Sequence, residues 1–355
     1  MKRKHAFACL LLTIFFVVFP VFTGFHFSSI FYIFTFLLCF TLPAQDFVKA
    51  LHILTKVLAF IVAISLPCWL IHQFIHPFPL FSVIDISNLK GGNVVLMENY
   101  IFFVINGSAD FDTLRFYAVF DEPGVLGTLS AFILYGNKYN FKKISNIIIL
   151  LGALFTFSLA FYVLFAIGFF YMSIKTLKNS KLTIAISLVV LAVSYEIIKE
   201  NPVFEQVVLA RFENGVADNL ERRTGYESQR YYEKIMWTPE FFLGMGTNKM
   251  NEKGLKDGAS HKLFIMENGF LALLSLMFAY YTLIRRKSLQ VYVFYLILCL
   301  SFLQRPKAFT AYQMFMFECV MCTMLSDVPV IKKKKKVLKA YDISVKQVDQ
   351  IAPGN

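Results

Sequence analysis

The chain is divided into long apolar runs, most of them separated by short polar loops, with two much longer polar stretches between them. The apolar runs occupy residues 6–23, 26–42, 57–74, 123–136, 145–158, 160–174, 182–198, 263–284, 289–304 and 308–326. A transmembrane helix needs roughly 20 predominantly apolar residues, so the pattern predicts an all-α polytopic membrane protein with about ten transmembrane helices. The polar stretches, residues 75–122 and 199–262, then form two long loops within a single integral membrane domain over residues 1–355.

The composition agrees with this pattern. Hydrophobic residues make up 57% of the 355 residues and charged residues only 16%, whereas a soluble domain carries about 25% charged residues. All six cysteines lie inside apolar runs, where they act as small hydrophobic side chains. The sequence contains no Walker loop, no HExxH motif and no nucleotide-sugar signature. We therefore expect neither a metal ion nor another cofactor.

Basic residues in the short loops set the expected orientation, because cytoplasmic loops are enriched in lysine and arginine. With ten spans and both termini in the cytoplasm, every basic cluster lies on the cytoplasmic side: Lys2, Arg3, Lys4, Lys49, Lys56, Lys138, Lys142, Lys143, Lys175, Lys178, Lys181, Arg285, Arg286 and Lys287. Residues 145–174 fit this orientation only as a tight hairpin of two short helices, with the turn near residues 156–160. The two polar stretches then become extracytoplasmic loops.

Both ends of the chain fit the same topology. Residues 1–22 resemble a signal peptide, but the apolar stretch is long and no A-x-A site follows it, so we expect an uncleaved first span. The basic tail, residues 327–355, includes five consecutive lysines, which we expect to bind anionic lipid headgroups on the cytoplasmic face. The net charge of +12 comes largely from such segments. Nucleic acid is therefore not an expected partner.

Candidate functional residues concentrate in the outward-facing segments. They are Arg115 and Glu122 before the fourth apolar run, Arg222, Arg223 and Arg230 in the second polar stretch, His261 just before the next run, and Arg305 and Lys307 in a short loop. Arginine forks bind phosphate oxygens bidentately, and a histidine accepts a proton or holds a hydroxyl. An enzyme acting outside the cytoplasm lacks ATP and sugar nucleotides. A polyprenyl-diphosphate sugar, which carries its own leaving group, therefore fits this set of side chains.

Four short motifs in this order resemble the bacterial O-antigen polymerase and O-antigen ligase superfamily over residues 115–285. The matching positions are Arg115, Phe120 and Pro123 in R-x-x-G-x-F-x-x-P, Ser158 in a T-x-S hairpin, Ser228, Arg230, Pro239, Gly244 and Gly246 in S-G-R…P-x-x-G-x-G, and Ser260, His261, Glu267 and Gly269 in a small-H-N…E-x-G segment. The sequence departs from these patterns at other positions, with Ala118 and Gln229 for glycines, Leu159 for arginine and Lys262 for asparagine.

The resemblance implies a membrane glycosyltransferase with a GT-C-like fold in the bacterial inner membrane. Such an enzyme polymerises undecaprenyl-diphosphate-linked oligosaccharide units into O-antigen or capsular polysaccharide on the periplasmic side, in contact with the lipid bilayer and with a chain-length regulator. Its implied catalytic residues are His261 and, second, Glu122. Its implied substrate-binding residues are Arg115, Arg230, Arg223, Arg222, Arg305, Lys307 and Ser158.

Two other functions remain open from the sequence. The ligase branch transfers the finished glycan to lipid A core, and a flippase or transporter moves a lipid-linked oligosaccharide across the membrane. Several candidate residues also have structural alternatives. Arg115 could anchor to lipid phosphates, His261 could be an ordinary interfacial histidine, and Arg222 and Arg223 could balance neighbouring glutamates.

Overall fold

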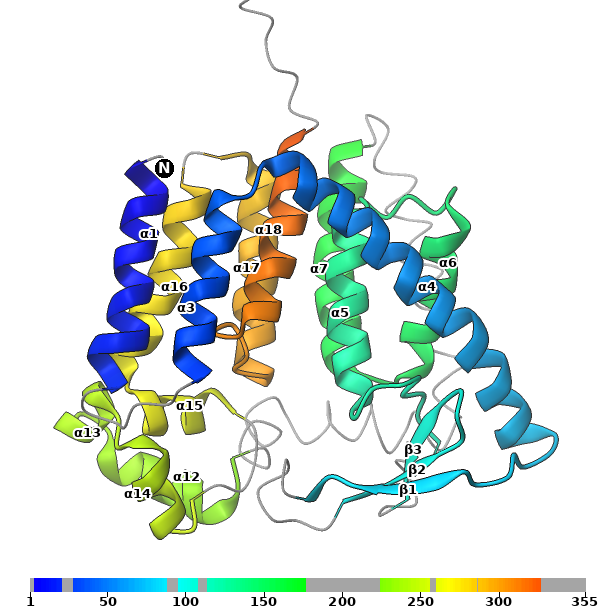
Figure 1. Ribbon diagram of the computed structural model, residues 1–355, viewed down its shortest axis with the longest axis horizontal. Coiled ribbons are helices and arrows are strands. Elements are labelled where there is room, and N and C mark those ends of the chain that lie inside the picture. Colours follow the sequence, from blue (N-terminus) through cyan, green and yellow to red (C-terminus); the bar gives the residue numbers. More distant parts are fainter. Residues whose placement is uncertain are drawn as a thin grey trace, which may run out of the picture.

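The computed structural model describes residues 3–20, 28–87, 95–107, 114–176, 224–255, 260–285 and 287–326. Most long helices run between two opposite ends of the molecule (Figure 1). The strands and the short helices lie together at one of these ends, which is drawn at the bottom of Figure 1 and is called the lower end below. The described parts of the two polar stretches therefore fold at the same end.

The helices account for the predicted apolar runs in the described residues. Their bounds are α1 (Arg3–Thr13), the π-helix η1 (Ile14–Val18), α3 (Ser28–Thr41), α4 (Ala44–Phe74), α5 (Pro123–Gly136), α6 (Ile144–Phe155), α7 (Leu159–Thr176), α12 (Tyr226–Ile235), α13 (Pro239–Leu243), α14 (Gly246–Glu252), α15 (His261–Asn268), α16 (Phe270–Ile284), α17 (Leu289–Gln304) and α18 (Ala311–Ser326). The predicted run at 182–198 lies outside the described residues, as does the tail at 327–355.

The prediction of about ten transmembrane helices is wrong. Within the described residues, only α4 is long and apolar enough to cross a membrane by itself, at 31 residues. Helices α15 and α16 reach the required length only together, and the chain bends by 110° between them. The other apolar helices are shorter than the roughly 20 residues that a span needs. Apolar runs alone did not show where each helix would end.

The prediction of an all-α fold is also wrong, because the first polar stretch contains an antiparallel sheet in the order β1-β2-β3. Its strands are β1 (Ser82–Asp85), β2 (Leu96–Asn99) and β3 (Val104–Asn106). The tight turn from β2 to β3 begins at Asn99, whose side-chain oxygen accepts a hydrogen bond from the Ile101 amide, which suits a residue that favours turns. At the start of β3, the Val104 amide donates to the Ala118 carbonyl, which ties the sheet to the segment that leads into α5.

The hairpin predicted within residues 145–174 is confirmed as two short helices, α6 and α7. Helix α6 ends at Phe155, and Phe157 has a φ of 46°, in the left-handed region that interrupts a helix. The Thr156 hydroxyl donates back to the Ala153 carbonyl at 2.6 Å, and the Ser158 amide bonds to the Thr156 hydroxyl. These local hydrogen bonds give the Ala153 carbonyl and the Ser158 amide a partner in the turn at the lower end of the molecule.

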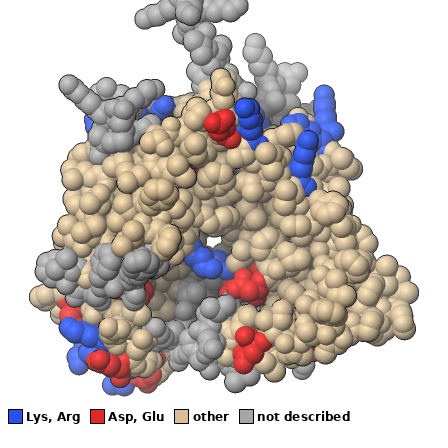
Figure 2. All heavy atoms as spheres, viewed as in Figure 1, with Lys and Arg blue, Asp and Glu red and all other residues tan. Residues whose placement is uncertain are grey.

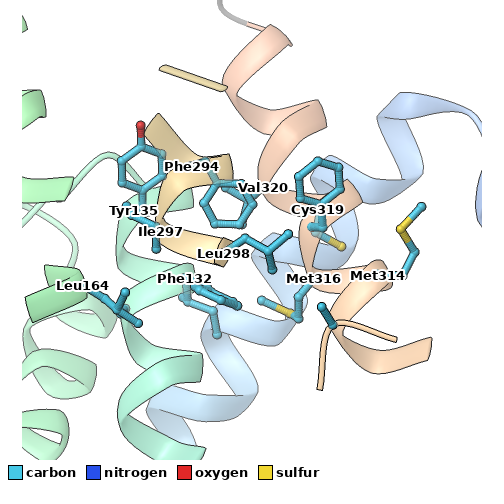
Figure 3. Close-up of a cluster of buried hydrophobic side chains, with 14 of the residues drawn as sticks. Phe132, Tyr135, Leu164, Phe294, Ile297, Leu298, Met314, Met316, Cys319 and Val320 are labelled. Carbon is cyan, nitrogen blue, oxygen red and sulfur yellow. The ribbon is translucent and has the colours of Figure 1, made fainter. Parts of the chain in front are cut away.

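A core of aromatic and sulfur-containing side chains holds α5 and α7 against α17 and α18 (Figure 3). The rings of Phe132 and Phe294 meet edge to face at 5.4 Å, and Tyr135 stacks on Phe294 at 5.6 Å. Phe294 also stacks on Phe317, at 5.8 Å. Aromatic pairs of this kind favour fixed relative positions. This packing fixes the start of α5 relative to the end of α17, where the candidate site lies.

The outer face of α1 and α16 is apolar and uncovered by other described residues. Helix α16 exposes Leu271, Leu274 and Phe278 at spacings of three and four residues, which places them on one helical face. Helix α1 exposes Phe7 and Leu10 beside it, and the rings of Phe7 and Phe278 meet at 6.3 Å. We call these five side chains the apolar face.

Candidate functional site

Two charged side chains from distant parts of the sequence meet at the lower end of the helices. Glu122 immediately precedes α5, and Arg305 immediately follows α17. Their side chains form an ion pair between Glu122 Oε2 and Arg305 Nη2. The Arg305 side chain is only 13% exposed and that of Glu122 is 32% exposed. The structure thus brings together two residues that the sequence placed in different segments.

Arg305 keeps one donor for another partner. Its Nε is buried and forms no hydrogen bond within the described part of the chain. A buried donor without an acceptor costs roughly 1–3 kcal/mol, so such a group is a natural place for a ligand oxygen. Native structures contain few donors of this kind.

Gly124 allows the guanidinium to stand this close to α5. A Cβ added at Gly124 would lie 2.7 Å from Arg305 Nη2. Any larger residue would therefore push the end of the Arg305 side chain away from its present position. This role could not be predicted from the sequence, because a glycine after proline at a helix start is typical of an ordinary turn.

Arg305 also lines a small pocket, together with Lys307, whose side chain is exposed. The remaining lining residues are Val125, Thr128, Ser301, Tyr312 and Gln313. The cavity volume of this pocket is about 30 Å³, and the pocket opens to solvent. This is far below the roughly 300–1,000 Å³ of ligand pockets. A ligand could therefore place only a small group, such as a phosphate oxygen, inside the pocket and would lie mostly outside it.

Figure 2 shows basic and acidic side chains meeting beside a hollow in the middle of the face drawn there. It also shows basic side chains along the upper edge of the same face. Charge in this view is therefore concentrated at the two ends and at the hollow, while the surface between them is mostly uncharged.

His261 opens α15 and lies beside the end of α17. Its Nδ1 is 3.4 Å from the Leu303 carbonyl oxygen, two residues before Arg305. A carbonyl oxygen can only accept, so Nδ1 carries the proton in this contact and Nε2 keeps a lone pair. Burial lowers the pKa of His261 below its usual 6.5, the Leu303 carbonyl opposes this shift, and the Lys262 charge adds to it. The imidazole is therefore neutral near pH 7 and able to accept a proton.

Arg115 has a different environment from Arg305. Its side chain is buried, and its guanidinium donates to the Thr156 carbonyl at 3.1 Å and to the Phe157 carbonyl at 3.5 Å. The Phe116 amide also donates to the Phe155 carbonyl at 2.9 Å. Arg115 thus binds the backbone of the α6–α7 turn. In this structure its guanidinium stabilises that turn.

Ser158 belongs to the same turn and is buried. Its hydroxyl accepts a long hydrogen bond, 3.5 Å, from the Phe161 amide at the start of α7. A Cβ added at Gly127 of α5 would lie 3.1 Å from the Ser158 Cβ and 3.0 Å from the Phe161 Cβ. The first two motifs of the sequence, around residues 115–127 and 156–160, therefore pack directly against each other.

The third and fourth motifs also pack together, through their backbones. Gly244 has a φ of 79° and Gly269 a φ of 92°, both in the region that favours glycine. A Cβ at Gly244 would lie 2.5 Å from the Glu267 carbonyl, and one at Gly269 would lie 2.5 Å from the Phe242 carbonyl. Only two glycines permit this contact between the α13–α14 turn and the α15–α16 bend.

Arg230 is not part of the cluster around Arg305. Arg230 is exposed on α12 and has no hydrogen bond or ion pair with the described residues. Its neighbour Gln229 accepts a hydrogen bond from Lys262 at 2.5 Å, which ties α12 to the start of α15. Arg222 and Arg223 lie outside the described residues.

Within the described residues, no group of three or more His, Cys, Asp or Glu side chains could hold a metal ion. The polar side chains of the site are instead arginine, lysine, glutamate and histidine, which suit a phosphate and a sugar hydroxyl. The sequence pattern could not select Gly124, Thr128, Ser301, Tyr312 and Gln313, because single residues of these types within apolar helices form no motif.

Comparison with known proteins finds no protein family, no curated protein and no solved structure that matches this chain.

Proposed function

We propose that the chain is a glycosyltransferase that uses a polyprenyl-diphosphate glycan as donor. The observation that carries this proposal is the convergence at one end of the molecule: Arg305 and Lys307 line one pocket, and His261 contacts the backbone two residues before Arg305. Two cations at one pocket and a neutral imidazole against the end of the neighbouring helix α17 suit a reaction in which a phosphate leaves and a hydroxyl loses its proton. The order of the four motifs supports the O-antigen polymerase and ligase superfamily as the reaction type.

The proposed step forms one glycosidic bond and breaks one sugar–phosphate bond. An acceptor sugar hydroxyl attacks C1 of the donor glycan, and the C1–O bond to the diphosphate breaks with its electron pair on the departing undecaprenyl diphosphate. His261 Nε2 accepts the proton of the attacking hydroxyl. Arg305 and Lys307 stabilise the charge that develops on the leaving diphosphate, a contribution that is often the largest in such reactions.

We propose a bacterial inner membrane as the location and lipid as a partner, because the donor is a lipid. The exposed side chains of the apolar face support this, since an uncovered apolar surface of this kind marks a site of contact with a protein or a membrane. Trp237, 74% exposed, lies two residues before α13, which contacts α16. Exposed tryptophans are enriched where hydrocarbon meets headgroups. The lower end would then lie at the membrane surface on the periplasmic side.

Purified protein in lipid nanodiscs provides the test of the reaction. A synthetic undecaprenyl-diphosphate trisaccharide serves as donor, and products are separated by mass. We expect longer lipid-linked glycans with a second lipid-linked unit as acceptor, and no transfer with lipid A core. Transfer to lipid A core alone would favour the ligase branch. Absence of any transfer, with the donor bound, would reject the proposal.

Variants locate the chemistry. His261→Ala should lower the transfer rate by about 10²–10⁴-fold, the usual size of general-base catalysis. Arg305→Ala should also abolish detectable product. Lys249, an exposed lysine of α14, provides the matched control: Lys249→Ala should retain the normal rate. Normal rates in both His261→Ala and Arg305→Ala would place the chemistry elsewhere.

The chain has two tryptophans, and this makes lipid contact measurable. Trp69 of α4 is 2% exposed and packs against Phe116 and Phe155. The Trp69→Phe variant leaves Trp237 as the sole tryptophan, and brominated phospholipids should quench its fluorescence strongly. The Trp237→Phe variant, which keeps only the buried Trp69, should be quenched much less. Equal quenching in the two variants would contradict contact between lipid and the Trp237 region.

A further inference from the structure

The Glu122–Arg305 ion pair occupies the place where a phosphate would have to bind. Arg305 offers its guanidinium to the pocket that Lys307 also lines. Glu122 already occupies one nitrogen of that guanidinium, while Nε remains buried without a partner among the described residues. One nitrogen of the guanidinium is thus paired with a carboxylate, while another has no hydrogen-bond acceptor among the described residues.

We propose that Glu122 is a displaceable occupant of a diphosphate subsite. A ligand diphosphate takes the Arg305 guanidinium and the Lys307 ammonium, and the Glu122 carboxylate moves out to water. This inference rests on the proposed function for the identity of the ligand, and deepens it by assigning the subsite and the residue that competes for it.

The chemistry of the two anions makes the exchange possible. Carboxylate and phosphate oxygens both accept the parallel N–H bonds of a guanidinium fork. A diphosphate offers more oxygens than one carboxylate, so it can also satisfy Nε, which Glu122 leaves without an acceptor. The diphosphate therefore gains a hydrogen bond that the resting state lacks.

The burial of the two partners sets the direction of movement. Arg305 is the more enclosed side chain and Glu122 the more exposed one. Glu122 can therefore regain water more readily than Arg305 can move. The close approach allowed by Gly124 also holds the guanidinium in position against α5. The cation stays and the carboxylate leaves.

Between substrates, this arrangement has a function of its own. An unpaired arginine at this pocket would bind any phosphate that reached it. With Glu122 in place, a single phosphate must compete with a carboxylate already bound, whereas a diphosphate gains contacts with both Arg305 and Lys307. The pair therefore selects for a diphosphate against inorganic phosphate.

Inorganic pyrophosphate is the probe for the test, because its binding requires no glycan. Titration calorimetry on the full chain in detergent, at fixed salt, compares the wild type with Glu122→Gln. Removal of the competing charge should tighten pyrophosphate binding by about twofold to fivefold, the range expected for a partly exposed ion pair. Arg305→Ala should weaken it by about tenfold or more, as for a hydrogen bond to a charged group.

The double variant gives the most specific result. In an Arg305→Ala background, Glu122→Gln should no longer tighten binding, because the carboxylate then has no guanidinium to compete for. Arg305→Lys replaces Arg305→Ala if the latter does not fold, and should reduce the Glu122→Gln effect by removing the fork. Lys249→Ala should bind pyrophosphate like the wild type. Glu122→Gln should increase the affinity for inorganic phosphate by a larger factor than the affinity for pyrophosphate.

Weaker or unchanged pyrophosphate binding in Glu122→Gln would overturn the inference, as would an equal gain in the Arg305→Ala background. The proposed function has its own outcome. Pyrophosphate binding as expected, without glycan transfer, would leave the subsite in place and reject the glycosyltransferase. If glycan transfer occurs but Glu122→Gln does not change the affinity for pyrophosphate, the proposed reaction stands and the displacement of Glu122 by a diphosphate is rejected.

Discussion

Arg115 and Arg305 had the same expected role in the sequence, and the structure gives them different environments. Arg115 lies before the apolar helix α5 and Arg305 follows the apolar helix α17, both at the lower end. Arg115 donates to two backbone carbonyls of the α6–α7 turn. Arg305 forms an ion pair with one glutamate and lines a pocket. The Arg115 guanidinium holds the backbone of a turn, whereas the Arg305 guanidinium keeps a buried Nε without a hydrogen bond among the described residues.

The comparison shows that the acceptors around an arginine decide its role. The backbone carbonyls that accept from Arg115 belong to the α6–α7 turn, so these hydrogen bonds hold only while the turn is folded. The Glu122 side chain is partly exposed, and the exchange proposed above requires it to leave Arg305 for water. Both arginines are mostly buried, and burial alone therefore does not separate a structural arginine from a binding one.

The largest expected effect is on stability, from Arg115→Ala. This change leaves the carbonyls of Thr156 and Phe157 without their donor inside the protein, and should lower the free energy of unfolding by about 3 kcal/mol. Thermal unfolding in detergent should show a clear fall in Tm for Arg115→Ala and a small one for Arg305→Ala. Arg230→Ala, at an exposed arginine, should change stability by less than about 0.5 kcal/mol. A larger loss of stability in Arg305→Ala than in Arg115→Ala would reverse the comparison.

Two glycines of α5 provide a second contrast. Gly127→Ala places a Cβ against the Cβ atoms of Phe161 and Ser158, which are attached to backbone and cannot swing away. This overpacking should cost about 1–3 kcal/mol of stability. Gly124→Ala meets only the end of the Arg305 side chain, so stability should hardly fall, while pyrophosphate binding weakens several-fold. If Gly124→Ala left pyrophosphate binding unchanged, the guanidinium position would not matter for the ligand.

The smallest effect concerns the pH dependence of transfer. Burial and the Lys262 charge lower the pKa of His261, so the neutral base persists below pH 6.5, and activity should fall only in more acidic solution. Lys262→Gln removes the charge and raises the His261 pKa. The acidic limb of the rate profile should therefore move to higher pH, by less than about one unit. Lys249→Gln should leave the profile in place. Movement of the limb to lower pH in Lys262→Gln would exclude His261 as the group that titrates.

The sequence by itself determined where most helices lie. Apolar runs predicted the helices from α5 to α7 and from α16 to α18, and the spacing of basic loops predicted the α6–α7 hairpin. These features depend on local composition, because a run of apolar residues favours a helix and a polar turn ends it. The sequence also selected Arg305, Lys307, Glu122 and His261 by their chemistry.

Tertiary structure decided the rest. The number of spans was wrong because breaks such as the bend at Gly269 shorten the helices, and hydropathy does not register a backbone angle. The sheet was missed because its strands are only three or four residues long. The environments of the two arginines depend on contacts between distant parts of the sequence. Arg115 donates to Thr156, 41 positions away. Arg305, after the end of α17, pairs with Glu122, before the start of α5. Such contacts form only when the aromatic core of α5, α17 and α18 brings those helix ends together, and no local pattern records them.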